Sequence, residues 1–342
     1  DMAPLSSLAK SLSRDFDDPR LAQLFARYAT YVGGLPQMSP AILSLIWQAE
    51  AAGVWVVKGG MHKLAHAIAA LLRSKGAVLR TNAHVRQIEV RDNAARSVTL
   101  EDETVLPCDY VVYAGDPRAL ATGALGTQLE KIAPTTKRAA RSLSARVHSF
   151  ATTPQGLDLA HHNVLFDGDP KAEFASLARG EIPDAPTIYI CAMDRGYDTP
   201  PPTLERFEII SNAPATQETR APKELETWHH MILQKMARFG LTLTPTPTMD
   251  TITTPQMFAT MFPASLGALY GQTPHGMLAA FQRPTARTPI NGLYLAGGGT
   301  HPGAGVPMAT LSARHAAEAI WNDLTSTSTW APTATHGGMS TA

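Results

Sequence analysis

The feature that most constrains the fold is a glycine-rich stretch near the C-terminus, residues 293–312, which reads LYLAGGGTHPGAGVPMATLS. An apolar run enters a loop with five glycines in nine residues, and a helical pattern follows the loop. Glycine has no Cβ, so a glycine-rich backbone can lie directly against another group. The N–H groups at the start of a helix attract negative or electron-rich groups. The stretch therefore predicts a strand, a binding loop and a helix.

Two known phosphate-binding motifs and a plain turn compete as interpretations of this loop. A P-loop requires a lysine directly after its last glycine, and no lysine follows these glycines. The dinucleotide fingerprint Gly-x-Gly-x-x-Gly fits no register here or elsewhere in the chain. A glycine-rich turn that binds nothing is the plain alternative. The succession of strand, glycines, Thr-His-Pro and helix disfavours it.

The size and charge of the chain narrow the class of protein. Its 342 residues are enough for two domains. Lys plus Arg and Asp plus Glu number 29 each, so the formal charge is zero and gives no support for a nucleic-acid partner. Two cysteines are too few for a disulfide framework, which favours a reducing, cytosolic setting. No run reaches the ~18–20 apolar residues that span a bilayer. Because the chain begins with Asp1 rather than Met, we expect an N-terminal portion to be missing.

Hydrophobic periodicity predicts a mixed α/β (α+β) chain. Helices are expected over 19–33, 39–53, 61–75 and 224–239, and strands over 54–57, 85–90, 98–100, 110–113 and several segments between 145 and 212. The run 110–113 has no polar alternation, which predicts a strand that is buried on both faces. Segments near 77–115 and 290–322 are expected to form one sheet domain, into which the residues between them are inserted as a second domain.

The glycine stretch and several other segments resemble one enzyme family. Residues 293–307 resemble the C-terminal flavin loop of carotenoid desaturases, which are FAD enzymes of the phytoene-desaturase type within the wider amine-oxidase-like group. Residues 59–64, 85–88 and 111–117 resemble other segments of that family. The hydroxyneurosporene or methoxyneurosporene desaturase branch is most similar at residues 31–34, 45–50, 161–166, 268–271 and 280–284. The resemblance covers roughly residues 20 to 322.

The resemblance implies a Rossmann-like FAD-binding domain that is incomplete at its N-terminus, because the Gly-x-Gly-x-x-Gly unit is absent. A substrate domain of mixed sheet and helices is inserted into it. The expected boundaries are 1–76 for substrate-domain helices, 77–117 for FAD-domain strands, 118–285 for the substrate domain, 286–324 for the last FAD-domain strand, loop and helix, and 325–342 for a disordered tail.

The resemblance also assigns cofactor contacts. They are expected from Val85, Asp116, Gly297, Gly298, Gly299, Thr300, Pro302, Gly303, Gly305, Val306, Pro307 and Met308. The three adjacent glycines would let the backbone approach FAD, where a Cβ would collide with the cofactor. Thr300 or water would replace a carboxylate that relatives place at Gly298. Val85 would contact the adenine through its backbone. Asp116 would lie near the dinucleotide, or it simply caps the helix that begins at Pro117.

The implied activity is the FAD-dependent 3,4-desaturation of an acyclic 1-hydroxy- or 1-methoxy-carotenoid. A phytoene desaturase or a flavin-dependent carotenoid isomerase is the alternative among enzymes. A flavin-free isoprenoid-binding protein is the alternative of another class. No catalytic residue is assigned, and a structural role is favoured for His301, which lies beside the loop. Candidates to line the substrate site are Tyr270, His275, Phe281 and Trp47, with core packing as the alternative.

Neither metal binding nor a membrane span is expected. His62 and His66 have i, i+4 spacing but no evident third ligand, and the neighbours His161 and His162 do not share a face of a strand. A long apolar substrate dissolves in membranes, so we expect a cytoplasmic enzyme that associates peripherally with the inner membrane. The helices at 19–33 and 39–53 have apolar faces that could form such a patch, although packing in the core is the commoner use.

Overall fold

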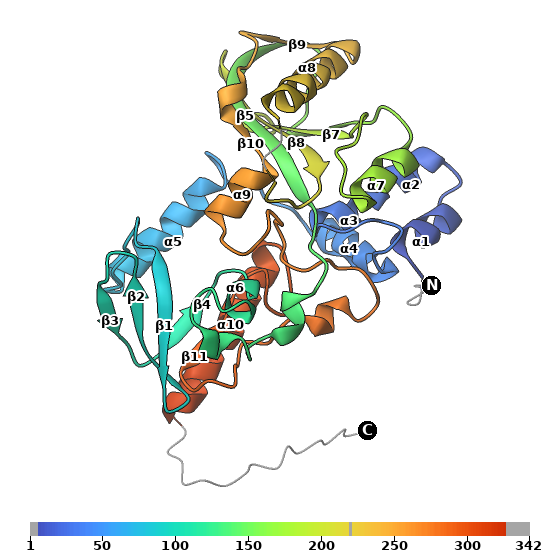
Figure 1. Ribbon diagram of the computed structural model, residues 1–342. Coiled ribbons are helices and arrows are strands. Elements are labelled where there is room, and N and C mark those ends of the chain that lie inside the picture. Colours follow the sequence, from blue (N-terminus) through green and yellow to red (C-terminus); the bar gives the residue numbers. More distant parts are fainter. Residues whose placement is uncertain (1–5, 219–220, 326–342) are drawn as a thin grey trace.

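The computed structural model describes residues 6–218 and 221–325, and within them it shows the mixed α/β architecture that the periodicity predicts (Figure 1). The largest sheet has six strands. Their order is β10 (Ile252–Thr253), β5 (Ser144–Gly156), β8 (Glu205–Ala213), β7 (Ile188–Ala192) and β6 (His162–Leu165), and β9 (Leu241–Thr244) also pairs with β5. All of these pairings are antiparallel.

One face of this sheet is covered by α8 (Pro222–Arg238), as Figure 1 shows. Burial alternates along β7 and β8, so every second side chain points toward the helix. The cluster on this face includes Trp228, Ile232 and Met236 of α8, packed with isoleucines of the strands and Phe207. The opposite face is half-buried, and polar side chains such as Cys191 and Glu208 lie on it.

Two smaller sheets lie apart from this core. β4 (Val111–Tyr113) and β11 (Leu293–Leu295) pair in parallel, and β1 (Val85–Arg91), β2 (Ala94–Leu100) and β3 (Val105–Pro107) form an antiparallel sheet. A second core cluster joins them: it contains Ile88 and Leu293, and also Leu120, Leu129 and Ile132, which follow the predicted boundary at 117. The domain boundaries remain predictions. This cluster leads us to propose that the unit extends at least to Ile132.

The N-terminal helices and α7 lie together at one side of the large sheet (Figure 1). They are α1 (Leu8–Asp15), α2 (Pro19–Ala26), α3 (Tyr28–Tyr31), the 3₁₀ turn η1 (Ala41–Ser44), α4 (Leu45–Ala51) and α7 (Pro170–Ala178). Asp18 caps α2 as its sequence predicts, because its side chain accepts a hydrogen bond from the Arg20 N–H. The remaining helical segments are α6 (Arg118–Ala121), α9 (Pro255–Met261), η2 (Thr127–Leu129), η3 (Pro134–Lys137), η4 (Met249–Thr251) and η5 (Ala279–Gln282).

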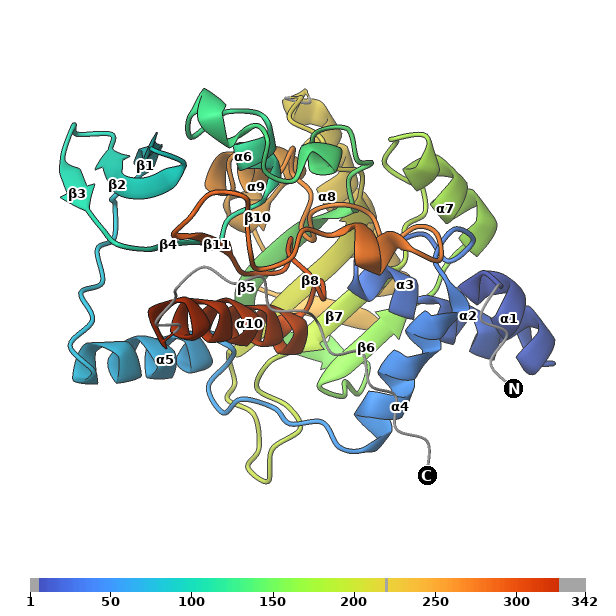
Figure 2. The same cartoon turned by 90° about the horizontal axis from the view of Figure 1, so that it is seen from below.

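Two long helices are largely exposed, α5 (His62–Ser74) and α10 (Val306–Thr325) (Figure 2). All of α5 is described, and none of its side chains is buried. On α10 the buried residues are small: Ser312, Ala316 and Ala319. No helix in the described ranges is both long and apolar enough to cross a membrane. The predicted disordered tail, 325–342, lies outside the described residues except for Thr325, which ends α10.

Two strand predictions are wrong. Residues 54–57 form no strand, and Val54 and Trp55 are 68% and 84% exposed because no described strand pairs with this segment. β4 is a strand but is not buried on both faces: Val112 is 47% exposed. Among the described residues β4 pairs with β11 alone, so a continuous apolar run here does not indicate a fully covered strand.

Candidate functional site: the glycine loop after strand β11

The candidate site lies where β4 and β11 end side by side. Because the strands are parallel, both of their loops, 114–117 and 296–305, leave from the same edge of the sheet. The ladder continues one step into the second loop, where the Ala296 N–H donates to the Tyr113 carbonyl at 3.0 Å. In open α/β sheets, ligands bind at the carboxyl ends of the strands. The predicted succession of strand, loop and helix is confirmed, and α10 begins at Val306.

The three adjacent glycines meet different surroundings. At Gly297 φ is +97°, and an added Cβ would lie 2.9 Å from the Ala114 carbonyl oxygen. At Gly299 a Cβ would lie 2.5 Å from Cδ of Pro117. Packing within the protein therefore requires both glycines. At Gly298 the nearest atom to a Cβ would be Cα of Ala304, at 3.7 Å, which is ordinary contact.

Gly298 is therefore the glycine of the three that the protein's own packing does not require. Its φ lies outside the left-handed region, so a side chain would cost little in backbone strain. A Cβ here would meet only backbone atoms of Gly303 and Ala304, at 3.7 Å or more. The room at Gly298 is compatible with a bound cofactor, whose contact there stays a prediction, while Gly297 and Gly299 are explained by turn geometry and by packing on Pro117.

Other loop residues that are predicted to contact a cofactor make contacts within the loop or shape its backbone. Thr300 is fully buried, and its hydroxyl donates to the Ala296 carbonyl at 3.3 Å. Pro302 follows a cis peptide bond, and Gly303 and Gly305 have positive φ values of +142° and +100°. The Gly297 N–H donates to Oγ of the buried Ser312 at 2.8 Å, which ties the loop to α10.

The first turn of α10 consists of residues from the predicted contact set. Val306, Pro307 and Met308 open the helix, and Val306 and Met308 are 55% and 42% exposed. The N–H groups of this turn and the helix dipole favour negative charge near them. The role of each residue in cofactor binding stays a prediction.

Arg283 is a buried residue beside the loop for which the sequence predicts no role. Its guanidinium donates to the carbonyls of Tyr270 at 3.1 Å, Gln272 at 3.0 Å and Gly298 at 2.8 Å. The residue is 7% exposed, and burial lowers its pKa to about 10, so it stays charged at neutral pH. Arg283 therefore fastens the glycine loop to the segment 270–272. Residues 280–284, which include Arg283, resemble a segment of the hydroxyneurosporene desaturase branch. That resemblance does not indicate which groups the guanidinium contacts.

Asp116 caps the helix that follows it, which is one of the two alternatives predicted for it, while its place near a dinucleotide stays a prediction. Its Oδ1 accepts from the Arg118 N–H at 2.9 Å and so caps α6, while its Oδ2 pairs with Arg141. The side chains of Asp116 and Arg141 are each 9% exposed. Burial lowers the pKa of Arg141, and the Asp116 carboxylate opposes that effect. Within residues 6–218 and 221–325, Nη1 of Arg141 is buried and makes no hydrogen bond.

Positive charge exceeds negative charge beside the loop. A Cβ on Gly271 would lie 3.4 Å from Cα of Gly299, 3.6 Å from Nη1 of Arg283 and 3.9 Å from Oδ2 of Asp116, so these groups converge. The Arg141 guanidinium pairs with Asp116 and adds a second positive charge. Arg118 instead bonds to Asp116 through its backbone N–H, and its guanidinium donates to the Ala264 carbonyl at 3.3 Å. The arrangement suits a ligand that carries or gains negative charge.

The remaining predicted residues lie in varied settings. Val85 opens β1 in the antiparallel sheet and pairs with Leu100, beside a surface pocket lined by residues 80–84, residues 100–102 and Thr104. Its predicted contact with the adenine stays a prediction. Tyr270 packs against Gly33, where a Cβ would lie 2.6 Å from the tyrosine ring, and its N–H donates to Oγ of Ser142 at 3.0 Å.

His275 has a structural contact. Its Nε2 accepts from the Leu35 N–H at 3.0 Å, which requires an unprotonated Nε2, and burial lowers its pKa. Phe281 is 76% exposed and stacks on His301, whose Nδ1 lies 3.1 Å from the Ala280 carbonyl. Trp47, on α4, is 49% exposed. The four candidates thus do not share one kind of environment, and their substrate roles stay predictions.

The sequence matches proteins whose function is known. The family model of flavin containing amine oxidoreductases matches residues 5–321. The chain is 48% identical over 322 residues to a hydroxyneurosporene desaturase of Rhodobacter capsulatus, covering 94% of this chain and 65% of that protein. It is 42% identical over 348 residues to the hydroxyneurosporene desaturase of Rubrivivax gelatinosus, covering 99% and 66%. The chain therefore spans about two thirds of the length of these relatives.

Solved structures share the fold. An oxidoreductase from Methanosarcina mazei matches with a TM-score of 0.59 and 16% identity, over 92% of this chain and 68% of that one. Putrescine oxidase matches with a TM-score of 0.51 and 15% identity, over 93% and 68%. The predicted fold class and the predicted resemblance to the hydroxyneurosporene desaturase branch are both confirmed by these similarities.

Proposed function

Because the chain belongs to the family of flavin-containing amine oxidoreductases, we propose that the loop after β11 binds the flavin end of FAD. The observation that carries this proposal is Gly298. It lies at the carboxyl edge of two parallel strands, and neither backbone strain nor a protein neighbour explains its lack of a side chain. FAD, when bound, supplies the hydride acceptor for dehydrogenation.

The protein's own residues would fix the loop and its charge. Arg283 holds the Gly298 carbonyl, so the backbone of the loop keeps one position. Arg141 has a buried Nη1 donor that is available to an acceptor on the ligand. The start of α10 adds a dipole worth ~0.3–1 kcal/mol toward negative charge. Together these groups would stabilise the charge that a flavin gains on reduction.

We propose that the substrate is an acyclic carotenoid with a 1-hydroxyl or 1-methoxyl group, because the curated relatives at 42–48% identity are hydroxyneurosporene desaturases. The reaction would turn a C–C single bond into a double bond: one carbon loses a hydride to the cofactor and its neighbour loses a proton. The face of the large sheet opposite α8 is half-exposed and includes Val147 and Ile210, and it could bind a polyene. We assign no base for the proton.

Peripheral membrane association is part of the proposal, since such a substrate resides in lipid. Its support is a set of exposed apolar side chains on η1 and α4, namely Ile42, Leu45 and Trp47, which are 44–49% exposed. Flotation of the protein with liposomes tests it. Replacing Trp47 by Ser should reduce the bound fraction, because aromatic side chains anchor proteins at the lipid interface.

The test of flavin binding is an FAD titration of the protein expressed from its complete reading frame. Wild-type protein should bind FAD in a 1:1 ratio. Gly298→Leu should weaken binding by about tenfold or more, because its side chain fills the space left for the ligand, whereas Gly298→Ala should weaken it less. Met257→Leu, an exposed change on α9, is the control and should bind as wild type does.

The outcomes separate the alternatives. If wild type binds no FAD but binds a carotenoid, the flavin proposal fails and an isoprenoid-binding protein takes its place. If FAD binds and 1-hydroxycarotenoids are not dehydrogenated, the flavin site stands and the substrate assignment fails. Conversion of phytoene, or isomerisation without loss of hydrogen, would point to the alternative enzymes.

A further inference from the structure

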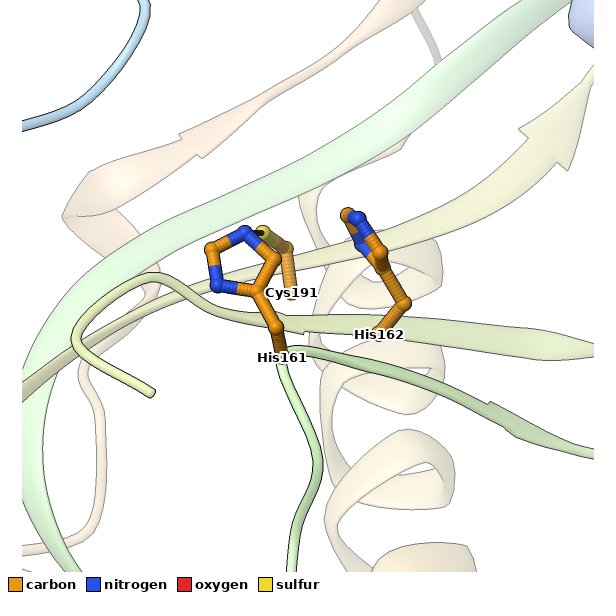
Figure 3. Close-up of side chains that lie close together, drawn as sticks. All are labelled: His161, His162 and Cys191. Carbon is orange, nitrogen blue, oxygen red and sulfur yellow. Dashed lines mark hydrogen bonds between the residues drawn. The ribbon is translucent and has the colours of Figure 1, made fainter. Parts of the chain in front are cut away.

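Three side chains that can bind a metal come together at the edge of the large sheet, away from the glycine loop. His161, His162 and Cys191 each offer one ligand atom, and these atoms all lie within 4.8 Å of one another. Figure 3 shows the two imidazole rings on either side of the Cys191 thiol. Among the described residues, no other group of three or more His, Cys, Asp or Glu side chains has its ligand atoms close enough together to hold one metal ion.

The topology of the sheet explains how two adjacent histidines share a site. His162 is the first residue of β6 and pairs directly with Cys191 of β7, so their side chains lie on the same face. His161 precedes β6, so its side chain does not have to follow the alternation of faces along the strand. The sequence argument against a metal site, that His161 and His162 do not share a face of a strand, does not exclude one here, because their ligand atoms lie within 4.8 Å of each other. Strand alternation is valid only inside a strand.

His161 is held in the orientation that a metal ligand needs. Its Nδ1 lies 2.6 Å from the Arg195 carbonyl, which fixes the proton on Nδ1 and leaves the Nε2 lone pair directed to Cys191, with which it is hydrogen-bonded. Nε2 lies 3.6 Å from Sγ of Cys191. Metal-bound histidines in proteins are oriented by a carbonyl or carboxylate in this way.

The carbonyl partner is itself fixed. The Arg195 guanidinium donates to both carboxylate oxygens of Glu205, at 2.7 and 3.0 Å, and to the Leu159 carbonyl at 3.0 Å. The next residue, Gly196, has φ of +83°, and a Cβ on it would lie 3.2 Å from Cβ of His161. The backbone at 195–196 is thus pressed against the histidine.

The distance between His161 and Cys191 matches a tetrahedral thiolate site. With Zn–N of about 2.0–2.1 Å and Zn–S of about 2.3 Å, a tetrahedral N···S edge is about 3.6 Å. The observed distance from Nε2 of His161 to Sγ of Cys191 is 3.6 Å. His162 is exposed, so a change of its side-chain torsions can close the remaining gap. Nδ1 of His162 lies 2.7 Å from the Tyr189 hydroxyl. This contact orients the His162 ring, as the Arg195 carbonyl orients that of His161.

We propose that His161, His162 and Cys191 form a binding site for one Zn²⁺ or a similar divalent transition metal. Sγ bonds the metal and the thiol proton leaves to solvent, while each imidazole donates a nitrogen lone pair. Three protein ligands leave a fourth position for water or another oxygen ligand. The site lies on the half-exposed face of the large sheet and does not depend on flavin.

The test is a titration of the purified, metal-free protein with Co²⁺, a spectroscopic substitute for Zn²⁺. Wild type should bind one equivalent and show a thiolate-to-cobalt charge-transfer band together with the intense visible bands of a tetrahedral site. Zn²⁺ should displace Co²⁺ and remove the bands. Mg²⁺, which prefers oxygen ligands, should not.

The variants identify the ligands. Cys191→Ser should abolish the charge-transfer band and weaken metal affinity by about 100-fold. Loss of a residue that only orients a ligand costs about 10- to 100-fold, so loss of a ligand itself should cost at least the upper value. His161→Gln should weaken metal affinity similarly. Cys108→Ser and His66→Gln are the matched controls and should bind as wild type does, since neither residue belongs to the cluster. Circular dichroism of each variant reports whether it folds.

A measurement on wild-type protein covers the case in which a variant does not fold. Zn²⁺ should slow alkylation of Cys191 by iodoacetamide, read by peptide mass spectrometry, and should leave Cys108 unaffected as the internal reference. Both thiols are free in the structure. The proposal is overturned if Co²⁺ binds without a thiolate band, if Cys191→Ser binds as tightly as wild type, or if Zn²⁺ protects neither cysteine.

Discussion

The six-stranded sheet and the glycine-loop region are stabilised by different means. In the large sheet, α8 seals one face with Trp228, Ile232 and Met236, which are at most 3% exposed. Around the glycine loop the ties are polar or steric: Arg283 to three carbonyls, Ser312 to Gly297, and Gly299 against Pro117. The contrast teaches that apolar packing fixes the scaffold, while hydrogen bonds and missing Cβ atoms fix the shape of the site.

The largest expected effect contrasts an isoleucine of the sealed core with an isoleucine on an exposed helix. Ile232→Ala, in the core between α8 and the large sheet, should lower the free energy of unfolding by about 2–5 kcal/mol. Ile68→Ala, on the exposed α5, should change it by no more than about 0.5 kcal/mol, because Ile68 is 51% exposed. Urea unfolding followed by circular dichroism measures both. Equal losses would contradict the division between a sealed core and an uncovered helix.

A smaller effect compares two neighbouring glycines in the loop. Gly299→Ala should destabilise the protein by about 1–3 kcal/mol, because its Cβ would meet Cδ of Pro117 at 2.5 Å. Gly298→Ala should leave stability nearly unchanged, because no atom would lie within 3.7 Å of its Cβ. Thermal unfolding without FAD separates the two. If Gly298→Ala proves the more harmful in that assay, Gly298 has a structural role and its link to the cofactor is lost.

The smallest effect is a pH dependence of the large sheet. His148 is fully buried, and burial lowers its pKa, as it does that of His229, whose ring lies 5.1 Å away. The unfolded chain takes up a proton near pH 6.5, before the folded protein does. Stability should therefore be complete above 6.5 and decline as the pH falls below it, by at most ~1.4 kcal/mol per pH unit for one proton.

Urea midpoints measured between pH 7.5 and pH 5 test this dependence, at fixed ionic strength. His148→Gln should be less stable at neutral pH and should show a shallower decline on acidification. An unchanged slope in that variant would assign the effect to other groups, His229 first among them.

Much of the scaffold follows from local sequence patterns. Asp18 before Pro19, the glycine after the 61–75 helix and the apolar periodicity of 224–239 each predict an element that the structure contains. The predictions are wrong where the structure of a segment depends on the neighbouring segments that it contacts. Residues 54–57 have strand-like composition but no strand beside them, and the burial of Val112 depends on what covers the sheet rather than on its own sequence.

In the candidate site, the glycine loop is predictable from the sequence, whereas the contacts of Arg283 and Arg141 that hold it are not. Five glycines in nine residues identify the loop directly. Arg283 and Arg141 act through carbonyls and a carboxylate that lie up to 25 residues away in the chain, and no periodicity encodes such contacts. The cluster of His161, His162 and Cys191 was excluded because one histidine lies just outside its strand, a boundary that sequence fixes poorly.

The brace made by Arg283 has a consequence for protein engineering. One guanidinium holds both the Tyr270–Gln272 backbone and the carbonyl of Gly298, so neither segment can shift without the other. Chimeras between this chain and its relatives should therefore exchange residues 268–305 as one block. A crossover placed inside that block would pair an arginine from one parent with carbonyl positions from the other.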